Sequence, residues 1–90
     1  LEVKEGRVNI ETNDAEGDSA LIKNYAKSYG GYVENFEKDD SENILRIILT
    51  VKVPFDEFDG FFDKVKNEFE TKDSNVQLYR VPIGEEISEL

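Results

Sequence analysis

The chain has 90 residues, enough for one domain with its own core, and its six Phe and four Tyr argue against disorder. The net charge of −10 disfavours nucleic acid and anionic lipid as partners, because phosphates are met by Lys and Arg. Without Cys or His, the chain lacks thiolates, disulfides, the commonest metal ligand and the usual general base near neutral pH.

A strand and a helix are predicted in the first third of the chain. The strand is expected within residues 1–12, where apolar and polar side chains come to alternate. Asp14 or Asp18 can cap the helix that follows, because a carboxylate accepts hydrogen bonds from the free N–H groups of a first turn. Apolar residues at helical spacing predict this helix from about 15 to 29, with a start as late as Ser19 because Gly17 is a weak helix former.

Two strands are predicted next, with a glycine pair before them. Gly30 stands where a left-handed helix end is favoured, and it ends the first helix. Alternation predicts a second strand over 32–37, and the polar residues 38–43 are expected to form a hairpin connection. The longest apolar run, 44–53, is rich in β-branched residues and predicts a central strand that Pro54 ends.

A second helix and a fourth strand complete the pattern. An apolar stripe of Phe and Val predicts the helix from residue 55 or 56 to about 70, and the strand covers 76–81. The order β-α-β-β-α-β predicts an α+β, ferredoxin-like two-layer sandwich: a four-stranded antiparallel sheet with both helices on one face and strands one and three in the middle. Residues 1–82 are expected to form this single domain, and 83–90 to begin a helical or linker segment.

Alternate residues of the third strand give the sheet two different faces. One face of this strand is wholly apolar, whereas the other carries Ile44, Arg46 and Ile48 beside polar residues. Apolar residues on a face without helices indicate either a cover, which is the C-terminal segment or a partner, or a few scattered apolar residues on a solvated face. The predicted partner surface is therefore formed by Ile44, Arg46, Ile48, Ile83, Ile87 and Leu90.

Two acidic clusters, at 13–18 and 39–42, are candidate cation sites. Calcium requires several converging oxygens, but the glycine of the first cluster precedes its last Asp, unlike the order in an EF-hand. A capped turn and an exposed hairpin loop explain the clusters better, so at most weak divalent-cation binding is expected. No catalytic, cofactor-binding or metal-ligating residue is predicted, because the sequence has no phosphate loop and no nucleophile with a nearby base. RNA binding is excluded, since the third strand carries no aromatic residue.

Short structural motifs resemble a bacterial family. Gly30-Gly31-Tyr32-Val33 and the strand end Leu49-Thr50-Val51-Lys52-Val53-Pro54, with Phe58 following, are similar to motifs of the domain family DUF4349. Lys52 stands where the family usually has Arg. The resemblance covers roughly residues 7–81 and implies an extracytoplasmic domain of an envelope protein, often a lipoprotein or a membrane-anchored chain. In the family a long coiled coil and a transmembrane helix tend to follow, and the apolar spacing of Ile83, Ile87 and Leu90 fits the start of such a coil.

The function predicted is that of a non-enzymatic, extracytoplasmic interaction or sensor domain tethered to a bacterial cell envelope. Its partner is expected to be another protein or its own C-terminal coiled coil, with membrane contact only through segments outside this sequence. No signal peptide and no membrane-spanning run are recognised in the sequence itself. The alternative is a cytoplasmic, ACT-like regulatory module, which has the same element order, pairs side by side and binds small ligands at the interface.

Overall fold

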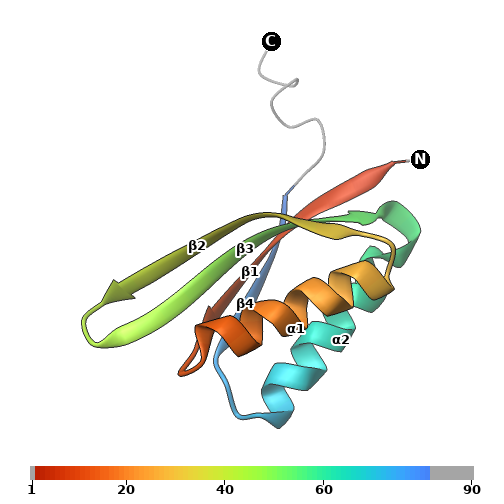
Figure 1. Cartoon of the computed structure of the whole chain (residues 1–90). Helices are drawn as coiled ribbons and strands as arrows, with labels where there is room; N and C mark the ends of the chain where they lie inside the picture. The colour runs from red at the N-terminus through yellow and green to blue at the C-terminus, as the bar shows by residue number, and fades with distance from the viewer. Residues whose placement is uncertain (1, 82–90) are drawn as a thin grey trace.

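The computed structural model describes residues 2–81. The chain forms β1 (Val3–Glu11), α1 (Ala15–Ser28), β2 (Tyr32–Ser41), β3 (Ile44–Pro54), a 3-10 turn (Phe55–Glu57), α2 (Phe58–Thr71) and β4 (Val76–Val81). The strands form one antiparallel sheet in the order β2-β3-β1-β4, and Figure 1 shows both helices on the same side of it. The predicted ferredoxin-like architecture is confirmed, with strands one and three in the middle.

The core lies between the sheet and the two helices. Every second residue of β3 from Ile47 to Val53 is buried, and β1 contributes Val8 and Ile10. Helix α2 presents the stripe expected from its sequence, with five buried apolar side chains. The core residues at most 8% exposed are Val8, Ile10, Ala15, Ile22, Ala26, Ile47, Leu49, Val51, Val53, Phe58, Phe61, Phe62, Val65 and Phe69.

Helix α1 is capped by hydrogen bonds at both ends. Asp14 is its N-cap, and the Asp14 Oδ1 accepts a hydrogen bond from the Gly17 N–H at 3.0 Å. The helix therefore begins at Ala15 and not at Ser19. At the other end the Gly31 N–H donates to the Ala26 carbonyl and the Gly30 N–H donates to the Lys27 carbonyl, while Gly30 has a φ of 82°. This arrangement is a Schellman motif, as the glycine pair predicted.

The β2–β3 hairpin differs from the prediction. The loop expected over 38–43 is largely strand, because β2 continues to Ser41 and pairs with β3 as far as Ile44. Only Glu42 and Asn43 form the turn, with φ values of 56° and 63°. Two positive φ values are typical of the type I′ turn, whose twist matches that of paired strands, so strand pairing overrides the polar composition. Nearly all side chains of β2 are exposed, and the hairpin tip reaches past the start of α1 in Figure 1.

Helix two also begins differently from the simple expectation. Pro54 ends β3 as predicted, but the next three residues form a 3-10 turn, and the α-helix begins at Phe58. Phe55 is consequently 54% exposed, and the Lys4 Nζ lies 4.5 Å from the centre of its ring. The stripe from Phe58 to Phe69 is therefore core, whereas Phe55 belongs to the surface.

Candidate functional site

The face of the sheet that lies away from α1 and α2, here called the open face, carries the described part of the predicted partner surface. Ile44, Arg46 and Ile48 are alternate residues of β3 and share this face. Ile48 lies between Asn9 of β1 and Glu37 of β2, and it is half-buried. Ile83, Ile87 and Leu90 lie outside the described residues.

The structure separates two of the predicted residues into different hollows. Ile44, which is 37% exposed, lines a polar hollow of about 490 Å³ at the end of the sheet where the hairpin turn and the α2–β4 loop meet β1. Ile48 lines a second hollow, on the open face itself, of about 430 Å³. This open-face hollow is lined by Arg7, Asn9, Ile48, Tyr79, Arg80 and Val81.

Residues of β1 and β4 complete the open-face hollow, and none of them is among the residues predicted from the sequence. Tyr79 lies opposite Arg7 in the β1–β4 ladder, and its side chain is half exposed, with the hydroxyl donating to the Gln77 Oε1 at 2.8 Å. Val81 lies opposite Glu5 at the end of the same ladder. The alternation in β4 could have assigned Tyr79 and Val81 to the open face. Val76 and Leu78 pack against the core, so Gln77, Tyr79 and Val81 must share the opposite face.

Ion pairs flank the hollow on this face. The Lys52 Nζ lies 3.3 Å from the Glu5 Oε1 and 3.9 Å from the Glu34 Oε2, and an Arg46 guanidinium nitrogen lies 3.8 Å from the Glu11 Oε2. Arg7 is the third cation here, and no carboxylate within residues 2–81 pairs with it. The open face therefore combines an apolar centre with charged margins and an Arg that the described residues do not neutralise.

The Lys52 pairs predict a small effect of alkaline pH on stability. The hydrogen bond with Glu5, followed by the charge of Glu34, raises the pKa of Lys52 above its ordinary value of 10.5. A raised pKa means that the stabilisation is fully present below pH 10.5 and disappears as the pH rises through the higher, folded-state value. The melting temperature of the wild type should exceed that of Lys52→Gln below this window, and the difference should vanish above it. A difference that persists above the window would contradict the prediction.

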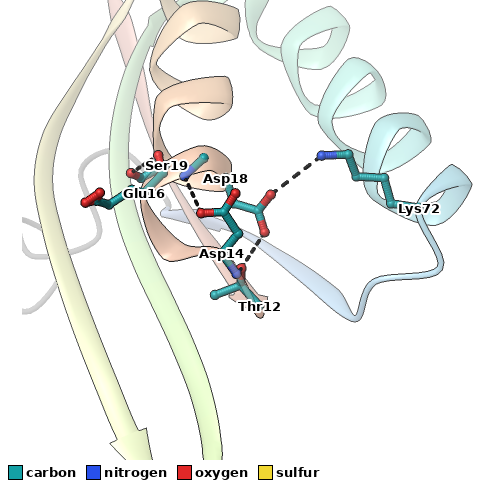
Figure 2. Close-up of polar contacts among 7 residues, drawn as sticks. Thr12, Asp14, Glu16, Asp18, Ser19 and Lys72 are labelled. Atoms are coloured by element: carbon teal, nitrogen blue, oxygen red, sulfur yellow. Dashed lines mark hydrogen bonds and ion pairs between the residues drawn. The ribbon is translucent and has the colours of Figure 1, made fainter.

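The first acidic cluster forms a polar network at the start of α1, shown in Figure 2. The buried Thr12 hydroxyl donates to the Asp18 Oδ2 at 2.6 Å, and the Thr12 Oγ1 accepts from the Asp14 N–H at 2.8 Å. The Asp18 Oδ1 faces the Lys72 Nζ at 3.6 Å. Asp18 is thus not a cap but a link between the end of β1 and the end of α2.

This network explains the acidic cluster without a metal ion. Each carboxylate oxygen of Asp18 has a protein partner, and one of Asp14 holds the helix cap. Within residues 2–81 no group of three or more carboxylates is arranged to hold a metal ion. In the second cluster, Asp39 and Asp40 are consecutive strand residues, so they point to opposite faces of the sheet. Weak cation binding stays a prediction.

Removing the Thr12 hydroxyl should destabilise the fold measurably. In Thr12→Val the Asp18 carboxylate loses its hydrogen-bond donor and the Asp14 N–H loses its acceptor, both in a largely buried position. We expect a loss of about 1–3 kcal/mol in the free energy of unfolding, measured by urea denaturation. The matched control is Thr71→Val, whose hydroxyl donates to the Asn67 carbonyl at an exposed site, and it should cost less than about 0.5 kcal/mol. Equal losses in the two variants would show that the network contributes nothing specific.

The family described as a domain of unknown function, DUF4349, matches residues 2–78. The chain belongs to the DUF4349 family. The resemblance seen in the short motifs is thereby confirmed. A search of curated proteins finds no match to this DUF4349 chain.

Solved structures resemble this DUF4349 domain in fold. An unknown protein from Galdieria sulphuraria superposes with a TM-score of 0.70 at 16% identity, over 90% of this chain and 51% of that one, so this chain spans about half its length. A de novo designed protein gives a TM-score of 0.69 at 13% identity, over 89% and 94% of the two chains. The ACT domain of the GTP pyrophosphokinase of Chlorobium tepidum gives 0.56 at 15% identity, over 89% and 97%. At such identities these likenesses concern the fold alone.

Neither helix within residues 2–81 has the length and apolar character needed to cross a membrane.

Proposed function

We propose that this DUF4349 domain is a non-enzymatic interaction module, which binds another protein through the open face of its sheet. The observation that carries the proposal is the composition of this face: Ile48, Tyr79 and Val81 gather at a hollow, and charged residues surround them. An apolar centre with a polar rim is the usual composition of a protein interface. The helices already bury the other face of the sheet, so its apolar residues need no partner.

The non-enzymatic part of the proposal rests on the chemistry of the hollow. Its polar groups are two Arg, an Asn and a Tyr: the Tyr hydroxyl is already hydrogen-bonded, and the Arg80 guanidinium already pairs with the exposed carboxylate of Asp59. The two side chains with raised pKa values, Tyr25 and Lys52, do not line this hollow. Arrangements of this kind suit recognition, since catalysis by side chains requires a titrating group aimed into a cleft.

Position-specific photocrosslinking tests the proposed surface. A photoreactive amino acid replaces Tyr79 on the open face or, as the matched control, Lys23 on the exposed side of α1, in the full-length protein inside its host cells. We expect a larger, discrete crosslinked product from position 79 and none from position 23. The product should disappear when Ile44 and Ile48 are both changed to Ser, a pair that leaves the core untouched because both side chains are on the open face. Crosslinking that is equal at both positions, or unfolding of the double variant, would contradict the proposal.

The proposed location is the bacterial cell envelope, outside the cytoplasm, with the domain tethered to a membrane through other segments. Membership of DUF4349 supports this location through the envelope proteins that the family resemblance implies. Protease treatment of intact cells and of cells with opened envelopes tests it on the full-length protein. Cleavage from outside, or only after the envelope is opened, together with sedimentation with membranes, is the expected result. A soluble protein that stays protected until the cytoplasm is released would overturn it.

The second candidate is an ACT-like regulatory module in the cytoplasm. It is favoured by the similarity in fold to the ACT domain from Chlorobium tepidum, which this chain matches over nearly all of that domain's length. A dimer in solution whose melting temperature rises with added free amino acids would support this candidate. A monomer that no amino acid stabilises would leave the interaction module as the better account.

A further inference from the structure

We infer that the free edge of β4, together with the neighbouring side of α2, binds an extended, basic segment of another protein, which joins the sheet as an additional strand. This surface differs from the open face, because its contacts are main-chain groups at the sheet edge and side chains of α2. Of the residues described so far, only Tyr79 and Arg80 line a hollow on both surfaces. The inference therefore does not depend on the proposed function.

The main chain of β4 has hydrogen-bonding groups that no described strand uses. Within residues 2–81, β4 lies at the edge of the sheet and pairs only with β1. The Glu11 N–H donates to the Asn75 carbonyl at 3.0 Å, at the start of this ladder, so the odd-numbered residues of β4 are the ones that bond to β1. The N–H and C=O groups of Val76, Leu78 and Arg80 therefore point away from β1, where an added strand can pair with them.

The two edge strands of the sheet differ in their protection against added strands. β2 carries four acidic residues, and a bulge interrupts its ladder between Val33 and Asn35. Charges and bulges are common means by which proteins prevent other strands from joining an edge. β4 pairs with β1 in one continuous register and contains neither an acidic residue nor Pro. The composition of β4 therefore permits strand addition, whereas that of β2 opposes it.

A hollow of about 560 Å³ lies between the edge of β4 and α2. Its apolar lining comes from Val76 and Leu78, which are half-buried, and from Phe62 of α2. Residues directly opposite each other in neighbouring strands have their side chains on the same face of the sheet. The residues of an added strand that pair with Val76 and Leu78 would therefore point toward α2, so every second side chain enters the hollow.

The charges beside the hollow favour a basic segment. Asp59, Asp63, Lys66 and Glu70 are spaced along one side of α2, and the contact of Asp59 with Arg80 at 2.6 Å shows that this side faces β4. Asp63 and Glu70 form no ion pair within residues 2–81. The rise of a helix separates these two carboxylates by about 10 Å. Residues four apart in a strand are separated by about 13 Å, so a Lys on each side of a central apolar residue reaches both.

A second copy of the chain fits this edge less well. Its β2 would bring four carboxylates close to Asp63 and Glu70. Pairing of β4 with its equivalent would place the two α2 helices side by side, so that the same carboxylates of the two copies approach one another. The charge of −10 on each chain adds to the repulsion, and it attracts a basic partner instead.

Amide hydrogen exchange of the 90-residue chain, followed by NMR, tests the inference. The probe is the synthetic peptide Thr-Lys-Thr-Val-Thr-Lys-Thr, which places its Val and both Lys on one side of a strand. At saturation we expect exchange to slow about tenfold at the N–H groups of Val76, Leu78 and Arg80, because these become hydrogen-bonded. The Tyr79 N–H, which already bonds to β1, should change little. A control peptide with N-methyl groups on its Val and Lys residues keeps the side chains but cannot donate to β4, and it should give no protection.

Charge reversal provides an independent readout at the same edge. Asp63→Lys with Glu70→Lys should weaken binding of the probe peptide several-fold, and this variant should bind the peptide with Glu in place of Lys more tightly than the wild type does. The matched control, Asp39→Lys with Asp40→Lys, makes the same change in net charge on the exposed β2 edge and should leave binding nearly unchanged.

Three results would overturn the inference: equal weakening by the two double variants, protection of β2 in place of β4, or protection by the N-methylated peptide. The variant in which Ile44 and Ile48 are both Ser should bind the probe peptide normally, because these residues lie on the open face. Failure of strand addition therefore leaves the open-face proposal standing, and failure of the open-face proposal leaves strand addition standing.

Discussion

Gly31→Ala is expected to be among the most destabilising single substitutions in this domain. A Cβ at residue 31 would collide with the main-chain carbonyl of Lys52 and lie 2.9 Å from the Cα of Val53. These atoms belong to β3, whose pairing with β2 begins at Tyr32 and Lys52, so neither side can move without shifting the ladder. We expect a loss of about 3 kcal/mol or more in the free energy of unfolding, at the upper end for overpacking. Urea denaturation measures it.

The neighbouring Gly30→Ala is the matched control. Gly30 needs its positive φ of 82°, but a Cβ there would meet only Pro54, at 3.4 Å. The cost is therefore that of a left-handed alanine, about 1–2 kcal/mol. If Gly30→Ala lowers the free energy of unfolding more than Gly31→Ala does, the prediction is wrong. The glycine pair would then be required by the helix cap and not by the close approach of residue 31 to β3.

Gly6→Ala should also destabilise the domain strongly, although alanine within a strand loses less backbone entropy on folding than glycine. Gly6 is buried in β1, and a Cβ there would lie 2.7 Å from the Phe58 Cζ and 2.8 Å from the Phe62 Cζ. Those two rings contact each other closely, with centroids 4.4 Å apart, so they have little room to retreat. We expect a loss of about 1–3 kcal/mol in unfolding free energy. Without the clash, Gly6→Ala would stabilise the folded domain by about 0.4–1 kcal/mol, because alanine lowers the conformational entropy of the unfolded chain.

A double variant identifies the cause. Phe62→Leu removes ring atoms that the new methyl would meet, so Gly6→Ala should cost less in the Phe62→Leu background than in the wild type. The expected coupling between the two sites is about 0.5–3 kcal/mol, the range seen for residues in contact. If the losses of the two single variants simply add in the double variant, contact with the Phe62 ring does not explain why residue 6 is glycine.

The alternation and helical periodicity of this chain are strong enough to predict its architecture. The apolar face of β3 and the Phe stripe of α2 lie in the core as their spacing indicated, and Gly30 and Pro54 end their elements where expected. These are local signals, because they depend on the backbone period and on the conformations that Gly and Pro allow. The length of β2 was not predictable in this way, since its polar second half is held by pairing with β3.

The candidate site was only partly predictable. Ile44 and Ile48 could be assigned to the open face from β3 alone, but the contribution of Arg7, Tyr79 and Val81 depends on the strand order and on the register of the ladders. The role of Asp18 likewise required Lys72 to be brought close from the far end of α2. Periodicity within one element cannot supply the register between elements.

By itself, the sequence determined the order of elements, the buried faces of β3 and α2, the C-terminal end of α1 and the exclusion of thiol and histidine chemistry. These properties follow from residue type and spacing within short segments. Only the tertiary structure decided that Gly6 must lack a side chain, that Asp18 links two elements, and that Arg7, Ile48 and Tyr79 share one hollow. Each of these depends on contacts between residues distant in the chain, which arise only when the strands pair in register and the helices pack onto them.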